Sequence, residues 1–94
     1  MSKNTRTAFV SGSGQKIGRA IVLELAKRGS NVIVNGSRNR KACEKVAAEA
    51  VGLGVEALVA MGDVGDPEAI RRISMEALKR FGTVDIRVNN AAIR

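Results

Sequence analysis

A glycine-rich stretch at residues 8–20, AFVSGSGQKIGRA, constrains the fold of this chain more than any other segment. A short apolar run at residues 8–10 ends just before Gly12, and an amphipathic pattern begins at Ile17. This order predicts a strand, a tight glycine turn and a helix. The glycine spacing is G-x-G-x-x-x-G, one residue wider at its end than the standard dinucleotide-binding fingerprint. The glycines alone therefore do not establish a dinucleotide site, and the prediction depends on the strand and helix patterns around them.

Each glycine of this turn has a physical role. Gly12 permits a turn that residues with a Cβ resist, Gly14 removes side-chain bulk where a ligand can approach the backbone, and Gly18 allows the helix to pack close to the strand. The start of the helix presents unpaired N–H groups and the positive end of the helix dipole, which favour an anion such as a pyrophosphate. An ordinary glycine-rich turn without a ligand is the alternative. The predicted site also includes residues between these glycines: Ser13, Lys16 and Ile17.

The composition restricts the class of protein. Of the 94 residues, 45% are hydrophobic and 27% are charged, as in a globular domain, and no apolar run approaches the length that crosses a bilayer. One cysteine, Cys43, and no histidine exclude a disulfide framework, zinc sites and histidine-based catalysis. The polar N-terminus leads directly into the first predicted strand, so we expect no secretory signal and a cytoplasmic location. We interpret residues 1–94 as one small domain.

The net charge of +7 is concentrated in the first half of the chain. Residues 1–47 contain ten Lys or Arg and two acidic residues (+8), whereas residues 48–94 contain six and seven (−1). A basic excess can indicate a nucleic-acid-binding protein, but the chain has no Tyr or Trp and only two Phe on which bases could stack. We therefore expect solvated surface cations to account for most of this charge, with no nucleic-acid partner.

The remaining hydrophobic patterns predict alternating helices and strands. The helices are expected from Ile17 to a stop at Gly29, at about residues 39–51, and from Pro67 to a stop at Gly82; the strands are expected at residues 8–10, 32–34, 55–60 and 84–88. Asp66 before Pro67 is a typical helix start, an N-cap acceptor followed by proline at the first helical position. Helical connections of this length require parallel strands and right-handed crossovers. The sequence thus predicts an α/β fold, a Rossmann-type doubly wound parallel sheet with strand order 3-2-1-4.

Three separated motifs together resemble the short-chain dehydrogenase/reductase family. The glycine turn stands where that family has T-G-x-x-x-G-x-G, with Ser11 in the threonine position and Lys16 in place of the middle glycine. Asp63 and Val64 follow the third predicted strand and resemble the family's Asp-Val pair at the adenine. A carboxylate just past a strand end can accept a hydrogen bond from the adenine amino group; turn chemistry within the loop is the alternative for Asp63.

The third motif, FGTVDIRVNNAA at residues 81–92, resembles the family segment that ends in N-N-A-G. The resemblance implies that Asn90 and Ala91 lie near the ribose of the cofactor. For Asn89 we expect a structural role, in which its amide ties neighbouring strands together. The resemblance covers the whole chain from about residue 7, and within the family the segment is similar to bacterial 3-oxoacyl-acyl-carrier-protein reductases.

The end of the second predicted strand bears on the choice of coenzyme. A chain that binds NAD typically has Asp or Glu here to hold the ribose 2′-hydroxyl, whereas this chain has Gly36, Ser37 and Arg38. No carboxylate repels a 2′-phosphate, and Ser37 and Arg38 can bind one by charge-assisted hydrogen bonds. Lys16, on the opposite side of the turn, can add a second positive charge. We therefore expect NADP(H) to be preferred over NAD(H); the alternative is that Arg38 and Lys16 are exposed surface cations.

Two residues depart from the family pattern. Lys16 stands where the family has glycine, so the structure has to show whether the turn keeps the backbone path that is usual in the family. Arg87 falls inside the fourth predicted strand, where the family usually has an apolar residue. Because a buried lone arginine is costly, we expect either that Arg87 faces solvent or that the strand is not fully covered.

The resemblance also implies what this segment lacks. Family members activate a substrate carbonyl with a Tyr-x-x-x-Lys pair and an upstream Ser, whereas this chain has no tyrosine. We therefore expect the N-terminal portion of a longer, homo-oligomeric oxidoreductase that transfers hydride between nicotinamide and a small carbonyl or alcohol, with no catalytic residue in this segment and no membrane partner. The alternatives are a non-catalytic nucleotide-binding module, a truncated product and, more remotely, a basic nucleic-acid-binding protein. Such a portion leaves one sheet edge open, which favours association of the isolated chain.

Overall fold

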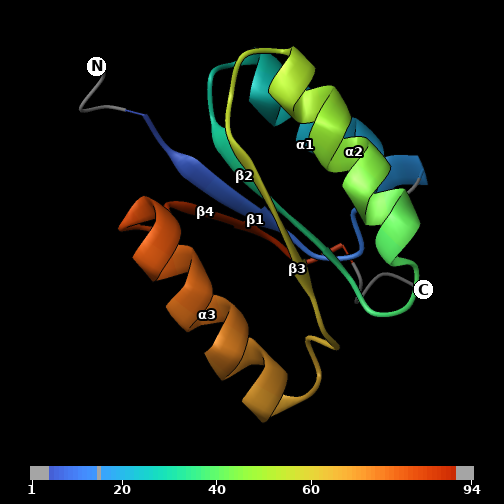
Figure 1. Ribbon diagram of the computed structural model, residues 1–94, viewed down its shortest axis with the longest axis vertical. Coiled ribbons are helices and arrows are strands. Elements are labelled where there is room, and N and C mark those ends of the chain that lie inside the picture. Colours follow the sequence, from blue (N-terminus) through green and yellow to red (C-terminus); the bar gives the residue numbers. More distant parts are fainter. Residues whose placement is uncertain (1–4, 15, 91–94) are drawn as a thin grey trace.

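The computed structural model describes residues 5–14 and 16–90, in which strands and helices alternate along the chain (Figure 1). The elements are β1 (Thr7–Val10), α1 (Lys16–Lys27), β2 (Asn31–Gly36), α2 (Arg40–Gly52), β3 (Ala57–Met61), α3 (Pro67–Phe81) and β4 (Ile86–Val88). The four strands pair in parallel in the order β3-β2-β1-β4. The predicted α/β fold and strand order are confirmed.

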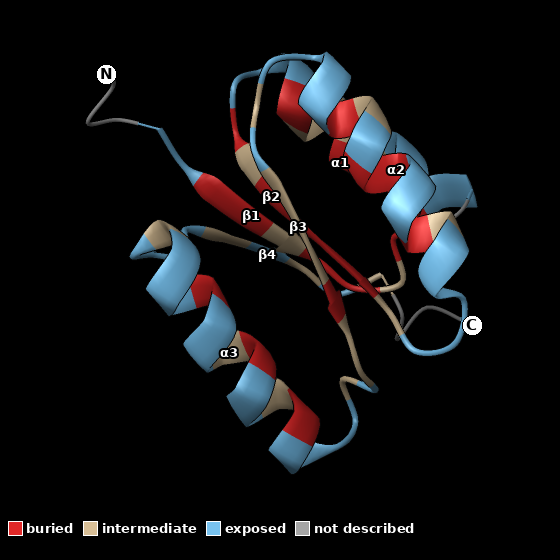
Figure 2. Ribbon diagram, in the orientation of Figure 1, coloured by how far each residue is buried: buried red, intermediate tan, exposed pale blue. Residues whose placement is uncertain are grey.

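The sheet has helices on both faces, with α1 and α2 on one side and α3 on the other (Figure 1). Successive side chains of a strand point to opposite faces, so β2 contributes to both layers. Val32 and Val34 pack in the cluster under α1 and α2, whereas Ile33 packs with Ile73 and Ala77 of α3. All three β2 residues are fully buried, as Figure 2 shows for the central strands. The unbroken apolar run therefore marks an internal strand that is covered on both sides, as predicted.

Local chemistry sets the two ends of α3. The side chain of Asp66 accepts a hydrogen bond from the N–H of Glu68 at 3.1 Å, and Pro67 occupies the first turn. At the other end Gly82 adopts the left-handed conformation, with φ of 80°, and its N–H donates to the carbonyl of Leu78 at 2.8 Å. Both predicted boundaries of this helix are confirmed, because capping depends on residues that are adjacent in sequence.

Strand pairing moves several predicted strand boundaries. β4 begins at Ile86 rather than at residue 84, because its pairing with β1 starts there. β2 continues to Gly36 rather than ending at Val34, because its last two residues pair with the last residues of β3. β3 begins at Ala57 rather than at Val55, since pairing with β2 starts there, opposite Val32. The edges of these strands are thus decided by register and not by the apolar run alone.

β4 lies at one edge of the described sheet and pairs only with β1. The N–H of Asp85 donates to the carbonyl of Thr7 at 2.9 Å, which brings the start of β4 beside β1. Arg87, in the middle of β4, is exposed, so the expectation that it faces solvent is confirmed. Among the described residues, no helix is both long and apolar enough to cross a membrane.

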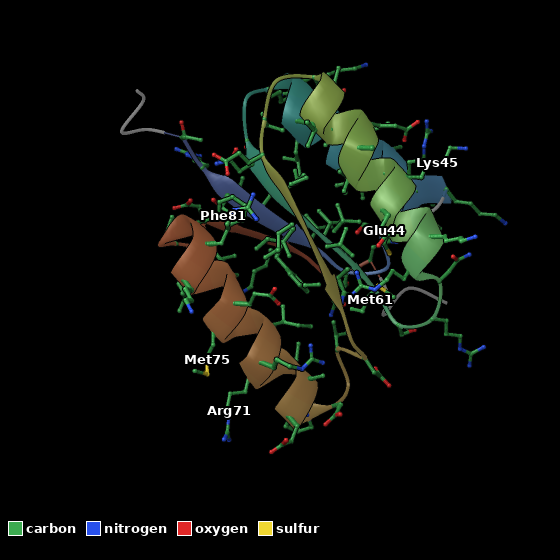
Figure 3. All side chains as sticks on the ribbon, viewed as in Figure 1. Glu44, Lys45, Met61, Arg71, Met75 and Phe81 are labelled. Atoms are coloured by element: carbon green, nitrogen blue, oxygen red, sulfur yellow. The ribbon has the colours of Figure 1, made fainter. Side chains whose placement is uncertain are left out.

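Replacing Ile33 by Ala is expected to lower the free energy of unfolding by about 2–4 kcal/mol, because it leaves a cavity between the sheet and α3. Urea denaturation followed by circular dichroism measures this loss. Met75 provides the control, since its side chain projects away from the sheet (Figure 3) and is 65% exposed. Met75→Ala is expected to change stability by about 0.5 kcal/mol or less. Equal losses in the two variants would contradict the two-layer core.

Candidate functional site

The predicted site residues lie on the segments that follow the four strands. Because the strands are parallel, their carboxyl ends meet at one edge of the sheet, which is where ligands bind in open α/β folds. The described members of the predicted set are Gly12, Ser13, Gly14, Lys16, Ile17 and Gly18 after β1, Ser37 and Arg38 after β2, Asp63 and Val64 after β3, and Asn90 after β4. Ala91, the remaining predicted residue, lies outside the described residues.

The glycine turn brings α1 unusually close to the end of β1. Gly12 adopts the left-handed conformation, with φ of 61°, as its predicted role in the turn requires. A Cβ at Gly18 would overlap the carbonyl oxygen of Gly12 and lie 2.7 Å from the Cα of Ser13. The predicted close packing at Gly18 is therefore present, and the group that α1 approaches is the backbone of the turn itself.

Lys16 keeps the backbone path that a glycine would take at its position. Its φ is 55°, and it is the one residue other than glycine with positive φ in the described part of the chain. A side chain in this conformation costs about 1–2 kcal/mol, because the Cβ crowds the following carbonyl oxygen. The turn thus retains its geometry with a cation at the first residue of α1, at an energetic cost to the free protein.

Hydrogen bonds tie the end of β4 to the glycine turn. The amide of Asn90 donates to the carbonyl of Gly12 at 3.0 Å, and the hydroxyl of Ser11 donates to the amide oxygen of Asn89 at 3.2 Å. The N–H of Ser11 also donates to the carbonyl of Val88 at 3.0 Å. These contacts agree with the structural role expected for Asn89, and they show a structural role for Asn90 as well.

A cleft of about 220 Å³ lies between the glycine turn and the start of α2, and two predicted segments meet in it. Its lining consists of Gly12, Gly14, Gly36, Ser37, Arg38, Asn39, Ala42 and Cys43. No carboxylate is among these residues. The structure thus brings the glycine turn and the predicted 2′-phosphate residues together. Lys16, Asp63 and Val64 do not line this cleft.

Cys43 also lines the cleft, although the sequence did not point to it as a site residue. A Cβ at Gly36 would lie 2.6 Å from the sulfur of Cys43, and a Cβ at Gly14 would lie 3.3 Å from it. A side chain at Gly36 would therefore force Cys43 to shift, whereas at Gly14 the contact would be tight. The thiol is buried, and this burial raises its pKa. The orientation of the helix that contains Cys43 is not known from the sequence, so the place of its thiol beside the cleft could not be predicted.

The cations around the site differ in whether a carboxylate neutralises them. Arg19 of α1 forms a two-fold contact with Glu49 of α2, at 2.9 and 2.8 Å, which lowers the pKa of Glu49 and raises that of Arg19. Arg40 pairs with Glu44 at 3.4 Å. Arg38, by contrast, is exposed and forms no ion pair with any described residue. Its guanidinium is thus an uncompensated positive charge in the lining of the cleft.

The loop after β3 is organised by its own hydrogen bonds. A carboxylate oxygen of Asp63 accepts from the N–H of Gly65 at 2.8 Å, and the carbonyl of Asp63 accepts from the N–H of Asp66 at 2.9 Å. The turn chemistry considered as the alternative role of Asp63 is therefore present. Its carboxylate is exposed, and its contact with an adenine stays a prediction.

Asn35 is the second residue that sequence reasoning missed. Its side chain is 2% exposed, and its amide donates to the carbonyl of Ala60 at 2.9 Å and to the carbonyl of Gly62 at 3.1 Å. The only indication of this role in the sequence is that one amide side chain directly follows the apolar run at residues 32–34. That pattern predicts a strand end, but it does not identify the carbonyl groups that the amide contacts.

Together the site offers features that fit a dinucleotide. Gly12 and Gly14 line the cleft without side chains, and the first N–H groups of α1 have no partner within the helix. An uncompensated guanidinium, that of Arg38, lies at the same cleft. These are the groups that bind phosphate anions, and no lining carboxylate opposes them.

The chain belongs to the short-chain dehydrogenase family, whose model, described as short chain dehydrogenase, matches residues 6–94. Membership implies a nicotinamide dinucleotide as the coenzyme. The chain is 41% identical over 97 residues to versicolorin reductase 1 of Aspergillus parasiticus, covering 99% of this chain and 37% of that protein. It is 36% identical over 91 residues to 3-oxoacyl-(acyl-carrier-protein) reductase FabG of Staphylococcus aureus, covering 97% and 37%.

Solved structures agree with this assignment. The 3-ketoacyl-ACP reductase from Sinorhizobium meliloti 1021 matches with a TM-score of 0.81 and 38% identity, over 86% of this chain and 31% of that one. The hydroxysteroid dehydrogenase from Escherichia coli matches with a TM-score of 0.83 and 30% identity, over 89% and 35%. The chain thus spans little more than a third of the length of the curated relatives described above.

Gly18→Ala is expected to lower the free energy of unfolding by about 1–3 kcal/mol, because the added Cβ meets backbone atoms that cannot move independently. Urea denaturation gives the value. Gly52→Ala is the matched control: no atom lies within 4 Å of a Cβ there, and we expect stability to be unchanged or to rise by up to about 1 kcal/mol. A Gly18→Ala chain as stable as the Gly52→Ala chain would refute the close approach of α1 to the turn.

Alkylation of Cys43 by iodoacetamide is expected to be at least about tenfold slower in the folded chain than in urea, because the thiol is buried and the thiolate is the reactive form. Mass spectrometry of timed samples measures both rates. Burial raises the pKa of the Cys43 thiol, so the folded chain binds the thiol proton more tightly than the unfolded chain does. The stabilisation that results from this difference is complete at pH values below the pKa of Cys43 in the unfolded chain. It is lost as the pH rises through the pKa of Cys43 in the folded chain. Equal alkylation rates would contradict the packing of α2.

Proposed function

We propose that this chain is the coenzyme-binding portion of an NADP(H)-dependent oxidoreductase that transfers hydride between the nicotinamide and a carbonyl or alcohol group. The observation that carries the proposal is Arg38, an exposed cation without a carboxylate partner among the described residues, in a cleft that also contains Gly12 and Gly14. One cleft therefore offers groups for the pyrophosphate and groups for a phosphate on the adjacent ribose.

The pyrophosphate binds at the start of α1 in this proposal. The N–H groups of Lys16, Ile17 and Gly18 belong to the first turn of the helix and have no acceptor within it. Together with the positive end of the helix dipole, they favour an anion. Gly12 and Gly14 allow the anion to approach the backbone of the turn, and Ser13 fixes that backbone from its buried position.

The 2′-phosphate of the coenzyme is bound by Ser37 and Arg38. A hydroxyl and a guanidinium both donate hydrogen bonds to phosphate oxygens, and the guanidinium adds an opposite charge. Lys16 supplies a further cation at the turn. NAD(H) lacks the 2′-phosphate, so it gains nothing from these charges, and this difference is the source of the proposed preference.

The adenosine and the second ribose bind at the ends of β3 and β4. Asp63 and Val64 form the adenine side, and Asn90 lies near the ribose. The bound coenzyme supplies the hydride chemistry. The residues of this chain bind and orient it, and the Tyr-x-x-x-Lys pair that activates the substrate in the family has no counterpart here, since the chain contains no tyrosine. The carbonyl or alcohol substrate class is proposed because three of the similar proteins named above are reductases and the fourth is a hydroxysteroid dehydrogenase.

Arg38→Ala is expected to weaken NADPH binding about tenfold or more, since it removes charge-assisted hydrogen bonds to the 2′-phosphate, and to leave NADH binding almost unchanged. Titration followed by the fluorescence of the reduced nicotinamide measures both affinities. The chain has neither Trp nor Tyr, so protein emission does not obscure that signal. The unaltered chain is expected to bind NADPH more tightly than NADH.

Arg40→Ala is the matched control. It removes the same charge two residues away, but Arg40 is paired with Glu44 within α2. We expect its effect on NADPH affinity to be about twofold or less. Equal weakening of NADPH and NADH by Arg38→Ala would refute the 2′-phosphate role, and an unaltered chain that binds neither coenzyme would refute the proposed function.

A further inference from the structure

The buried residue Asn35 connects segments of the site that belong to three different strands. Its main chain continues β2 toward the Ser37–Arg38 segment, and its side-chain amide crosses to β3. There it donates to the carbonyl of Ala60, its partner in the sheet, and to the carbonyl of Gly62, which lies beyond the end of β3. The second of these bonds fixes the residue that immediately precedes Asp63.

On its other side Asn35 is joined to the glycine turn through Ser13. The N–H of Ser13 donates to the carbonyl of Asn35 at 2.8 Å, and the N–H of Asn35 donates to the hydroxyl of Ser13 at 2.9 Å. That hydroxyl in turn donates to the carbonyl of Val10, at the end of β1, at 2.7 Å. Ser13 is fully buried. A continuous series of hydrogen bonds therefore runs from the phosphate-binding turn, through Asn35, to the loop that carries Asp63 and Val64.

The sheet itself does not require an amide at this position. The three preceding residues of β2 are apolar and fully buried, and an apolar side chain here would avoid the cost of desolvating a polar group. What the amide adds is a specific geometry, since it satisfies two carbonyl groups at fixed distances. One of these, that of Gly62, belongs to the loop and not to the strand ladder.

We propose that Asn35 is a positioning residue for the coenzyme: it holds the glycine turn and the loop after β3 at the separation that one dinucleotide spans. This inference rests on the proposed function, because the two segments need a fixed separation only if one ligand contacts both. Asn35 acts through these segments and does not itself touch the ligand. Pre-organised loops spare the ligand the cost of ordering them when it binds.

The same strand contains a matched control. Asn31, at the opposite end of β2, also uses its side chain to bond to a neighbouring backbone group: its amide oxygen accepts from the N–H of Glu56 at 2.9 Å. Asn31→Ala and Asn35→Ala therefore each remove one asparagine that connects β2 to the β3 segment, but only Asn35 lies at the edge with the proposed site. A purely structural role predicts effects on stability in both variants and no separate effect on coenzyme affinity.

The experiment measures dissociation constants for NADPH and NADH, with the folded fraction taken from urea denaturation of each variant. Loss of folded chain can raise the apparent dissociation constant only by the reciprocal of the folded fraction. Beyond that factor, Asn35→Ala is expected to raise the dissociation constants of both coenzymes about tenfold, because both must span the two segments. Asn31→Ala is expected to leave both constants unchanged after the same correction. This pattern differs from that of Arg38→Ala, which is selective for NADPH.

Asn35→Thr keeps the test decisive if Asn35→Ala does not fold. Threonine suits a buried strand, and its single hydroxyl can donate to only one of the two carbonyl groups. We expect native circular dichroism and a smaller but measurable loss of affinity. Folded Asn35 variants with wild-type dissociation constants would overturn the positioning role while leaving the proposed function intact. A wild-type chain that binds neither coenzyme would overturn both.

Discussion

The carbonyl group of Gly12 is the point on which the geometry of the site depends. β1 ends two residues before Gly12, Asn90 beyond β4 donates to the Gly12 carbonyl at 3.0 Å, and α1 passes so close that a Cβ at Gly18 would overlap it. Three elements are thus fixed against one backbone group. Their relative placement determines where the free N–H groups of α1 point, and so which ligand atoms can reach them.

The charge distribution is consistent with this arrangement. Two basic residues of these helices are paired with carboxylates: Arg19 of α1 contacts Glu49 of α2, and Arg40 contacts Glu44 within α2. The lysines of α1 and α2 form no ion pair among the described residues. Exposed ion pairs of this kind contribute little stability, but they neutralise charge. Arg38 has no such partner among the described residues, and it stands at the cleft formed by the glycine turn and α2. Several cations of the described chain are therefore unpaired, and Arg38 differs from the others in that it lines this cleft.

Prediction from the sequence succeeded where neighbouring residues decide the outcome. Asp66 with Pro67 and the left-handed Gly82 delimit α3 as expected, and the strand order follows from the lengths of the connections. The strand boundaries at Gly36 and Ala57 could not be predicted, because they depend on the register between β2 and β3. The positive φ of Lys16 likewise required the structure, since an unfavourable conformation is imposed by the surrounding turn and not by the residue itself.

The sequence by itself determined the class of fold, the position of the glycine turn and the absence of a carboxylate directly after β2, because each depends on short-range patterns of residue type. Only the tertiary structure decided that Cys43 fills the space beside Gly36 and Gly14, and that Asn35 joins the glycine turn to the loop before Asp63. These contacts connect residues far apart in the chain through a few backbone atoms. Hydrophobic periodicity specifies which face of an element is buried, but it does not specify which carbonyl a buried amide will meet.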